Sequence, residues 1–153
     1  MVLTVPLLFG LATFPSPGHA SHHVCYLDGE GTLYAGDAAG VRIRPSEFVL
    51  PPTPPPEVDL EAWVRTIDEL ERRGPERLAL IHFGVFEDAE RHLEELRRRL
   101  RDWAERVRAG ATEEQFAAEA AADLADDRAA YEQAMPFWQS YAGLRRYWEK
   151  RAA

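Results

Sequence analysis

The chain has 153 residues, a formal net charge of −8 and a hydrophobic content of 46%. Its length suits one domain with a buried core, and its composition is that of a globular protein. The negative charge argues against nucleic-acid binding, which needs clustered positive charge to neutralise phosphates. A single cysteine, Cys25, excludes an internal disulfide. Nothing therefore requires an oxidising compartment, and we expect a cytoplasmic protein in which Cys25 is a buried thiol.

Residues 2–14 are apolar and could form either a signal peptide or a strand. They lack a basic beginning, and no convincing small-residue cleavage site follows them. The apolar stretch is also too short for a membrane-spanning helix. We therefore predict one or two short strands, interrupted near Pro6 or Gly10, and no membrane partner.

Residues 16–37 predict a β-hairpin between two loops. Two apolar runs flank a turn at residues 28–31, which is typical of antiparallel strands. A hairpin brings the outer ends of its strands together, so His19 and Asp37 should be neighbours. An imidazole and a carboxylate in such a position are candidate metal ligands. A surface hydrogen bond is the more common role for a pair of this kind.

Residues 45–56 are rich in proline, which favours extended, polyproline-like backbone. Apolar residues 48–50 indicate a linker packed beside the site, rather than a recognition segment for a proline-binding module. Asp59 is then a predicted N-cap for a helix that ends before Gly74. The apolar run 78–81 predicts a strand that leads to His82, and ligands collect at such strand ends in α/β sheets.

From Glu87 onward, large apolar residues recur at intervals of three and four, which predicts only helices. These stripes should form core, and their surplus of aromatic residues could also serve a dimer interface. His92 lies in a heavily charged helix, so we expect a solvated surface residue. The order of segments predicts an α/β (α+β) fold in one domain: residues 1–84 form a partial β-sandwich layer with one helix, and residues 85–153 form a helical region packed on it.

Three short motifs, in this order, resemble the later metal motifs of the metallo-β-lactamase-fold hydrolases: Ser-Pro-Gly-His at residues 16–19, Tyr-Ala-Gly-Asp at 34–37 and Ile-His-Phe-Gly at 81–84. The end of the chain, residues 143–148, also resembles the terminal helix of one branch of that family. The resemblance covers roughly residues 13–150. It implies the second half of an αββα sandwich with a C-terminal helical extension.

The resemblance also implies a site. His19 would bind one metal ion, His82 a second, and Asp37 would bridge both as the catalytic carboxylate. The ions would be zinc, or iron or manganese, and the family site holds two of them. The substrate would be a small ester, thioester or lactone, with a phosphoester also open, because fold alone does not fix the substrate.

One family motif, His-x-His-x-Asp-His, is absent from this sequence. A catalytic zinc usually takes three protein ligands, whereas each position here would have one histidine and a shared aspartate. We therefore expect a truncated metal-dependent hydrolase that binds metal weakly, together with a homo-oligomeric or complementing polypeptide partner. The alternative is a catalytically inactive remnant that acts as a protein-association module.

Two further histidines, His22 and His23, follow His19. Successive residues of a strand point to opposite sides, so at most one of them can face His19. We expect them to support the ligands or to line the pocket. If half of a sandwich is missing, apolar sheet surface should also be exposed around Leu7, Leu8 and Leu11.

Overall fold

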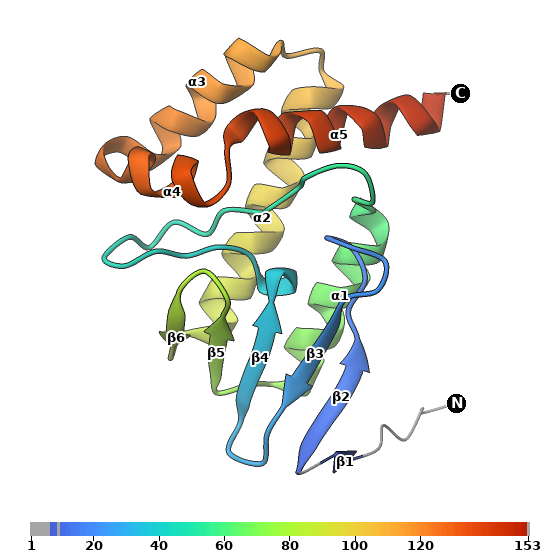
Figure 1. The fold of residues 1–153 in the computed structure, drawn as a ribbon, viewed down its shortest axis with the longest axis vertical. Coiled ribbons are helices and arrows are strands. Elements are labelled where there is room, and N and C mark those ends of the chain that lie inside the picture. The colour runs from blue at the N-terminus through green and yellow to red at the C-terminus, as the bar shows by residue number, and fades with distance from the viewer. Residues whose placement is uncertain (1–6, 9, 153) are drawn as a thin grey trace.

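A computed structural model describes residues 7, 8 and 10–152 of the chain (Figure 1). One sheet holds six strands in chain order: β1 (Leu7–Leu8), β2 (Leu11–Pro15), β3 (Val24–Leu27), β4 (Thr32–Gly36), β5 (Arg77–Leu80) and β6 (Gly84–Phe86). Neighbouring strands are antiparallel except β4 and β5, which are parallel and joined through a helix. This mixed α/β arrangement confirms the predicted fold class.

The predicted hairpin is formed by β3 and β4. Asp28 closes its turn, because its side-chain Oδ1 accepts hydrogen bonds from the backbone N–H groups of Glu30 and Thr32 at 2.9 and 2.8 Å. The strand region before it is divided by a turn at Gly10 into β1 and β2. The predicted strand residues 2–6, with the interruption at Pro6, lie outside the described residues.

The helical elements are η1 (Asp37–Ala39), α1 (Leu60–Arg73), α2 (Ala89–Arg108), α3 (Glu113–Leu124), η2 (Ala125–Asp127), α4 (Arg128–Ala134) and α5 (Phe137–Ala152). In Figure 1, α1 and α2 lie behind the sheet, and α3, α4 and α5 form a second group beyond its end. Asp59 caps α1 as predicted, since its carboxylate accepts from the Ala62 N–H at 2.9 Å, and Gly74 ends that helix in a left-handed conformation. Among the described residues, no helix combines the length and the apolar character needed to cross a bilayer.

The core lies between the sheet and the helices, and its largest fully buried side chains are aromatic: Trp63, Trp103, Phe116, Tyr131 and Phe137. Two short elements were not predicted. The chain turns back after His82 to form β6, so the sheet continues to Phe86, two residues beyond the expected boundary at 84. The helix α4 follows α3 after a single 3-10 turn.

The expectation for His92 is wrong. This side chain is 1% exposed, and its Nε2 donates a hydrogen bond to the Ala39 carbonyl at 2.7 Å. The charges around it on α2 belong to the other helix faces, whereas the His92 face packs against η1 and Phe86. Burial lowers the pKa of His92 to about 4, so the imidazole is neutral near pH 7.

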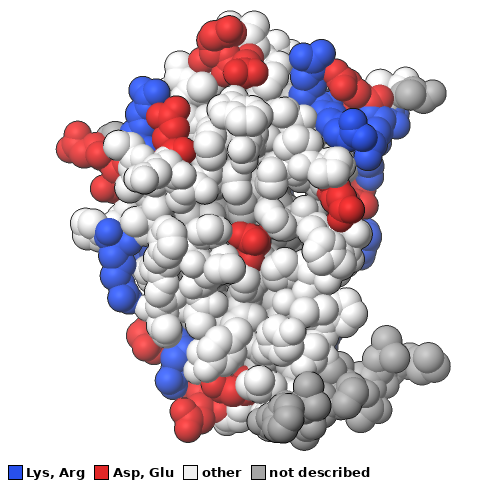
Figure 2. All heavy atoms as spheres, viewed as in Figure 1, with Lys and Arg blue, Asp and Glu red and all other residues white. Residues whose placement is uncertain are grey.

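One face of the sheet is exposed. The register places Tyr26 opposite Tyr34, Tyr34 opposite Ala79, and Ala79 opposite Val85, so these side chains form a row across four strands. Tyr26, Tyr34 and Val85 are 38%, 46% and 42% exposed. Figure 2 shows that charged side chains gather at the periphery of this view and are sparse in its middle. The side chains of Leu7 and Leu8 lie outside the described residues, and Leu11 is partly buried.

Candidate metal centre

The loop that carries His19 is fixed on α1. The Asp59 N–H donates to the Gly18 carbonyl at 2.9 Å, and the Thr66 hydroxyl donates to the Pro17 carbonyl at 2.6 Å. Gly18 has a φ of 144° and packs so closely on Trp63 that an added Cβ would lie 2.3 Å from the Trp63 Cβ. Only glycine fits there without displacement, and this close approach sets the position of His19.

The His19 ring is oriented through its Nδ1, which lies 2.8 Å from the Pro52 carbonyl oxygen. A carbonyl only accepts, so Nδ1 carries a proton, and in the neutral ring Nε2 then has the free lone pair. The Trp63 ring system and the imidazole pack in a T-shaped arrangement, with ring centroids 5.9 Å apart. Nε2 faces Asp37 and lies 3.6 Å from its Oδ2.

Asp37 is the first residue of η1, directly after β4. Its two carboxylate oxygens face two different imidazoles: Oδ2 faces His19, and Oδ1 lies 3.4 Å from His82 Nε2. The structure therefore brings the three predicted ligands together around one carboxylate. Their side chains are 15%, 23% and 28% exposed for His19, Asp37 and His82, so the cluster reaches the surface.

His82 lies two residues beyond β5, and its backbone is held by the segment that follows η1. The Arg42 N–H donates to the His82 carbonyl at 2.9 Å, and the Phe83 N–H donates back to the Arg42 carbonyl at 3.1 Å. The Nδ1 atom of His82 is buried and has no hydrogen-bond partner within the described part of the chain. His82 thus has no counterpart, within the described residues, to the contact from Pro52 that orients His19.

His23 supports the cluster, whereas His22 does not contact it. The backbone N–H of Asp37 donates to His23 Nε2 at 3.2 Å, and His23 Nδ1 lies 2.8 Å from the Ser16 hydroxyl oxygen. Burial lowers the pKa of His23, which favours the neutral ring that this acceptor role needs. His22 is exposed and lies 3.8 Å from Glu57. Both precede the first residue of β3, so strand alternation does not determine where they point.

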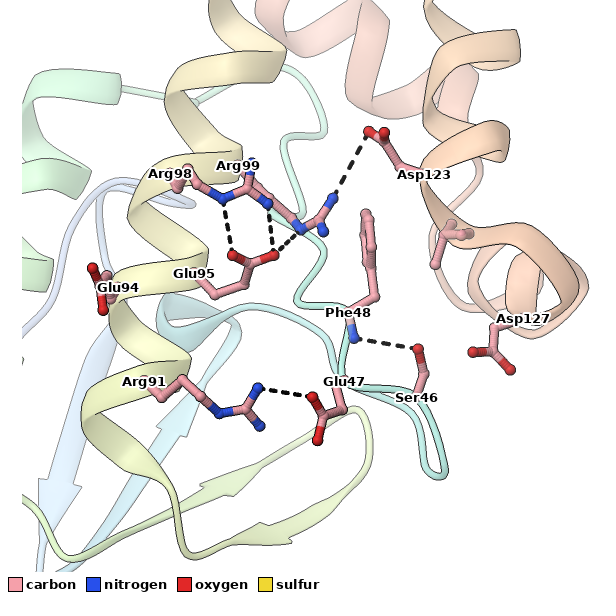
Figure 3. Close-up of a pocket in the computed structure, with 11 residues that line it drawn as sticks. Ser46, Glu47, Phe48, Arg91, Glu94, Glu95, Arg98, Arg99, Asp123 and Asp127 are labelled. Carbon is pink, nitrogen blue, oxygen red and sulfur yellow. Dashed lines mark hydrogen bonds and ion pairs between the residues drawn. The ribbon is translucent and has the colours of Figure 1, made fainter.

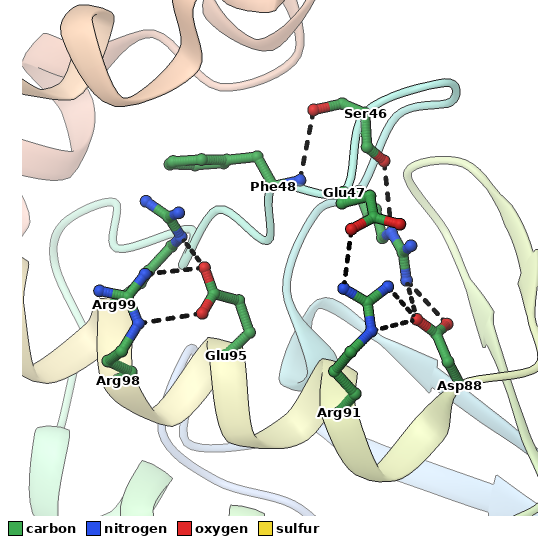
Figure 4. Close-up of polar contacts among 9 residues, drawn as sticks. Ser46, Glu47, Phe48, Asp88, Arg91, Glu95, Arg98 and Arg99 are labelled. Carbon is green, nitrogen blue, oxygen red and sulfur yellow. Dashed lines mark hydrogen bonds and ion pairs between the residues drawn. The ribbon is translucent and has the colours of Figure 1, made fainter.

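The proline-rich segment reaches the site, since Pro52 holds His19, and it is fixed by contacts on α2. Arg91 pairs with Glu47 at 3.0 Å, and the Arg99 guanidinium lies over the Phe48 ring at 3.6 Å (Figure 4). These residues line a cavity of about 530 Å³ between the segment, α2 and the end of α3 (Figure 3). Arg91, Arg98 and Arg99 are all paired with carboxylates: the Arg91–Glu47 pair ties the segment to α2, whereas Arg98 and Arg99 pair with Glu95 of their own helix.

The donor set fits a metal ion only in part. Two ligands of one tetrahedral zinc lie about 3.3 Å apart, given metal–ligand lengths of about 2.0–2.1 Å. The separations of 3.6 and 3.4 Å from Asp37 to His19 and His82 are close to that value. However, no group of three or more His, Cys, Asp or Glu residues in the described ranges is arranged to hold one ion. Each position therefore has two donors from this chain.

The supporting groups had no sequence signal of their own. The Pro52 carbonyl is a backbone atom, and the bond from the Asp37 N–H to His23 depends on how the hairpin closes. The apolar anchors of the proline-rich segment were the one indication that it packs beside the site.

Comparison with known proteins identifies relatives by structure. No protein-family model and no curated protein matches this sequence. A metallo-β-lactamase family protein from Thermus thermophilus is similar with a TM-score of 0.62 and 23% identity, over 94% of this chain and 45% of that one. An archaeal metallo-β-lactamase superfamily protein from Sulfolobus tokodaii is similar with a TM-score of 0.50 and 26% identity, over 57% of this chain and 32% of that one. The chain thus spans less than half the length of either structure.

Proposed function

We propose that this chain, which has the metallo-β-lactamase fold, provides part of the metal centre of a metal-dependent hydrolase. His19 and His82 each contribute one imidazole to a separate metal position, and Asp37 contributes one carboxylate oxygen to each. The remaining ligands come from protein groups that this sequence does not contain. A small ester, thioester or lactone is the substrate class.

One observation carries this proposal: the two oxygens of Asp37 face the Nε2 atoms of two histidines from different loops. The orientation of His19 supports a ligand role rather than a simple ion pair. Histidines that bind metal generally donate their other ring N–H to a carbonyl or carboxylate, and His19 donates to Pro52 in this way.

The exposed sheet face supports completion by another polypeptide. It carries Tyr34 and Val85, which are 46% and 42% exposed, and the turn between β5 and β6 adds Ile81 and Phe83, which flank His82 in sequence and are 60% and 56% exposed. Large apolar patches of this kind mark surfaces that other protein covers. A partner on this face would lie next to the cluster and could bring the ligands that it lacks.

The residues of this chain have distinct parts in such a site. Zinc, when bound, supplies Lewis acidity and lowers the pKa of water towards neutrality. Asp37 would contribute one negative charge to both metal positions, one carboxylate oxygen facing each. His23 keeps the Asp37 backbone in place, and Pro52 fixes the His19 tautomer. Each orienting contact of this kind is typically worth 10–100-fold in metal affinity.

The test measures zinc binding by the isolated chain through competition with a chromogenic chelator. We expect weak binding that falls at least tenfold in His19→Gln and in Asp37→Asn, because each loses one of two donors. His22→Gln is the matched control, since His22 is exposed and outside the cluster. We expect its zinc affinity to equal that of the wild type, and turnover of a chromogenic thioester to be negligible in all four proteins.

Equal zinc affinity in wild type, His19→Gln and Asp37→Asn would contradict the proposal. The chain would then be better described as an inactive protein-association module. Stoichiometric zinc with His19-dependent thioester turnover would instead show that this chain holds a complete site.

A further inference from the structure

A second site lies on the helical side of the molecule. A groove of about 480 Å³ runs between α1, α2 and α5, and none of the three candidate metal ligands lines it. Its volume is in the range of small-molecule pockets, about 300–1,000 Å³. Its apolar lining comes from all three helices: Leu60, Val64, Leu100, Ala104, Tyr147 and Trp148.

Two polar side chains of the groove, Trp148 and Arg97, are engaged within the protein. The Trp148 indole N–H donates to the Ala104 carbonyl at 2.9 Å, so it is not available to a ligand. Arg97, which also lines the groove, pairs with Asp68 at 2.7 Å and Glu71 at 2.8 Å. The body of a bound molecule would therefore meet mainly apolar surface.

Charge at the groove is unbalanced in one respect. Its two carboxylates are engaged by arginines outside the groove: Glu61 pairs with Arg151, and Glu105 pairs with Arg108. By contrast, Arg65 and Arg101 line the groove and have no carboxylate within ion-pair distance in the described part of the chain. The uncompensated charges of this groove are thus positive, although the whole chain carries −8.

The helix geometry places these two arginines at the same level. α1 and α2 run antiparallel (Figure 1), since Arg97 of α2 pairs with Asp68 and Glu71 of α1, while Leu60 and Ala104 line the same groove. In this register Arg101 is opposite Arg65. Two guanidinium groups that line one groove from neighbouring helices, neither of them paired with a carboxylate, favour an anion there, because guanidinium groups bind carboxylates through charge-assisted hydrogen bonds.

We propose that the groove binds an anionic amphiphile, an aliphatic chain with a terminal carboxylate. The carboxylate lies between Arg65 and Arg101, and the chain lies along the apolar surface of Leu60, Val64 and Trp148. This binding site is separate from the proposed metal centre, and neither proposal depends on the other.

The test titrates the purified full chain with dodecanoate below its critical micelle concentration, by isothermal calorimetry. We expect binding of one dodecanoate and at least tenfold weaker binding in Arg65→Gln/Arg101→Gln, which loses two charge-assisted contacts. Arg146→Gln is the matched control, because Arg146 is exposed and lies outside the groove, and we expect wild-type affinity. Val64→Asp should also weaken binding, since it places a carboxylate on the apolar wall.

Dodecyltrimethylammonium carries the same chain with a cationic headgroup. The net charge of −8 would favour this cation if binding were non-specific, so a preference for dodecanoate supports the groove. Equal affinity for the two amphiphiles, or an unchanged affinity in the double arginine variant, would overturn the proposal. A failure of dodecanoate to bind would overturn it too. If Val64→Asp then abolished self-association of the chain, the groove would be a protein-binding surface instead.

Discussion

His92 helps to position the candidate metal centre through a buried hydrogen bond. Its Nε2–H bond to the Ala39 carbonyl holds the end of η1, and η1 begins with Asp37. Its Nδ1 is buried and has no hydrogen-bond partner within the described residues. A proton added to Nδ1 would therefore introduce a charge with no acceptor, close to the guanidinium of Arg42. The folded state consequently favours the neutral ring.

This leads to a prediction for stability against pH. An unfolded histidine titrates near 6.5, whereas the folded pKa of His92 is about 4. The unfolded state thus binds the proton first as pH falls, and the free energy of unfolding should drop by about 2 kcal/mol between pH 7 and pH 5 from this group. Urea unfolding at both pH values tests this. His92→Gln should lose most of that drop, whereas His22→Gln should retain it; identical drops in the two variants would show that other groups cause it.

Contacts between residues that are close in the chain can be recognised from local sequence signals. Asp59 caps α1, and Thr112 and Gln115 exchange the two hydrogen bonds of a capping box. Each depends on a spacing of three residues, which the sequence displays directly. His92 was misjudged because its partner, Ala39, is 53 residues away. The charged residues beside it in sequence lie on the other faces of α2, so they do not indicate whether His92 is buried.

At the scale of elements, α4 secures the segment that carries Pro52. The Tyr131 hydroxyl donates to the Phe48 carbonyl at 2.6 Å and accepts from the Ile43 N–H at 3.0 Å. Tyr131 is fully buried, and its ring packs against Phe48 with centroids 5.6 Å apart. One side chain of a short helix thus satisfies a backbone group of the proline-rich segment and another just before it.

Removing this hydroxyl should be costly. Tyr131→Phe leaves the Phe48 carbonyl and the Ile43 N–H without their buried partner, and we expect a loss of about 1–3 kcal/mol in the free energy of unfolding. Chemical denaturation measures it. Tyr26→Phe is the matched control, since Tyr26 is 38% exposed, and its effect should stay within about 0.5 kcal/mol. Equal stability of the two variants would show that water replaces the Tyr131 contacts.

Elements differ in how far the sequence reveals them. The hairpin and α1 were predictable because their apolar patterns and turn residues lie within one segment. The strand β6 and the helix α4 were not, since three and seven residues are too few to display a period. For the site, motif order predicted that His19, Asp37 and His82 meet, but the carbonyl and amide groups that orient them follow only from the packed fold.

At the scale of the whole molecule, one face of the sheet is covered by helices and the other is exposed. Phe14, Cys25, Leu78 and Phe86 are buried on the side of α1 and α2. On the other side the row from Tyr26 to Val85 is open, and few charges interrupt it (Figure 2). Removing apolar side chains from water is favourable, so a molecule that covers this face would gain binding free energy. The sheet alone therefore predicts that this molecule associates.

The final prediction concerns that association. The isolated chain should self-associate through the open face when no other partner covers it, because the face carries little charge to keep two copies apart. The variant Tyr34→Lys/Ile81→Lys/Val85→Lys places three charges on exposed positions and should sediment as a monomer at concentrations where the wild type is larger. Trp138→Lys is the control: Trp138 is 55% exposed but lies on α5, so this variant should associate like the wild type. Circular dichroism and thermal unfolding establish that all variants are folded. If the triple variant and the wild type have the same concentration-dependent mass, the open face is not the surface through which this protein associates.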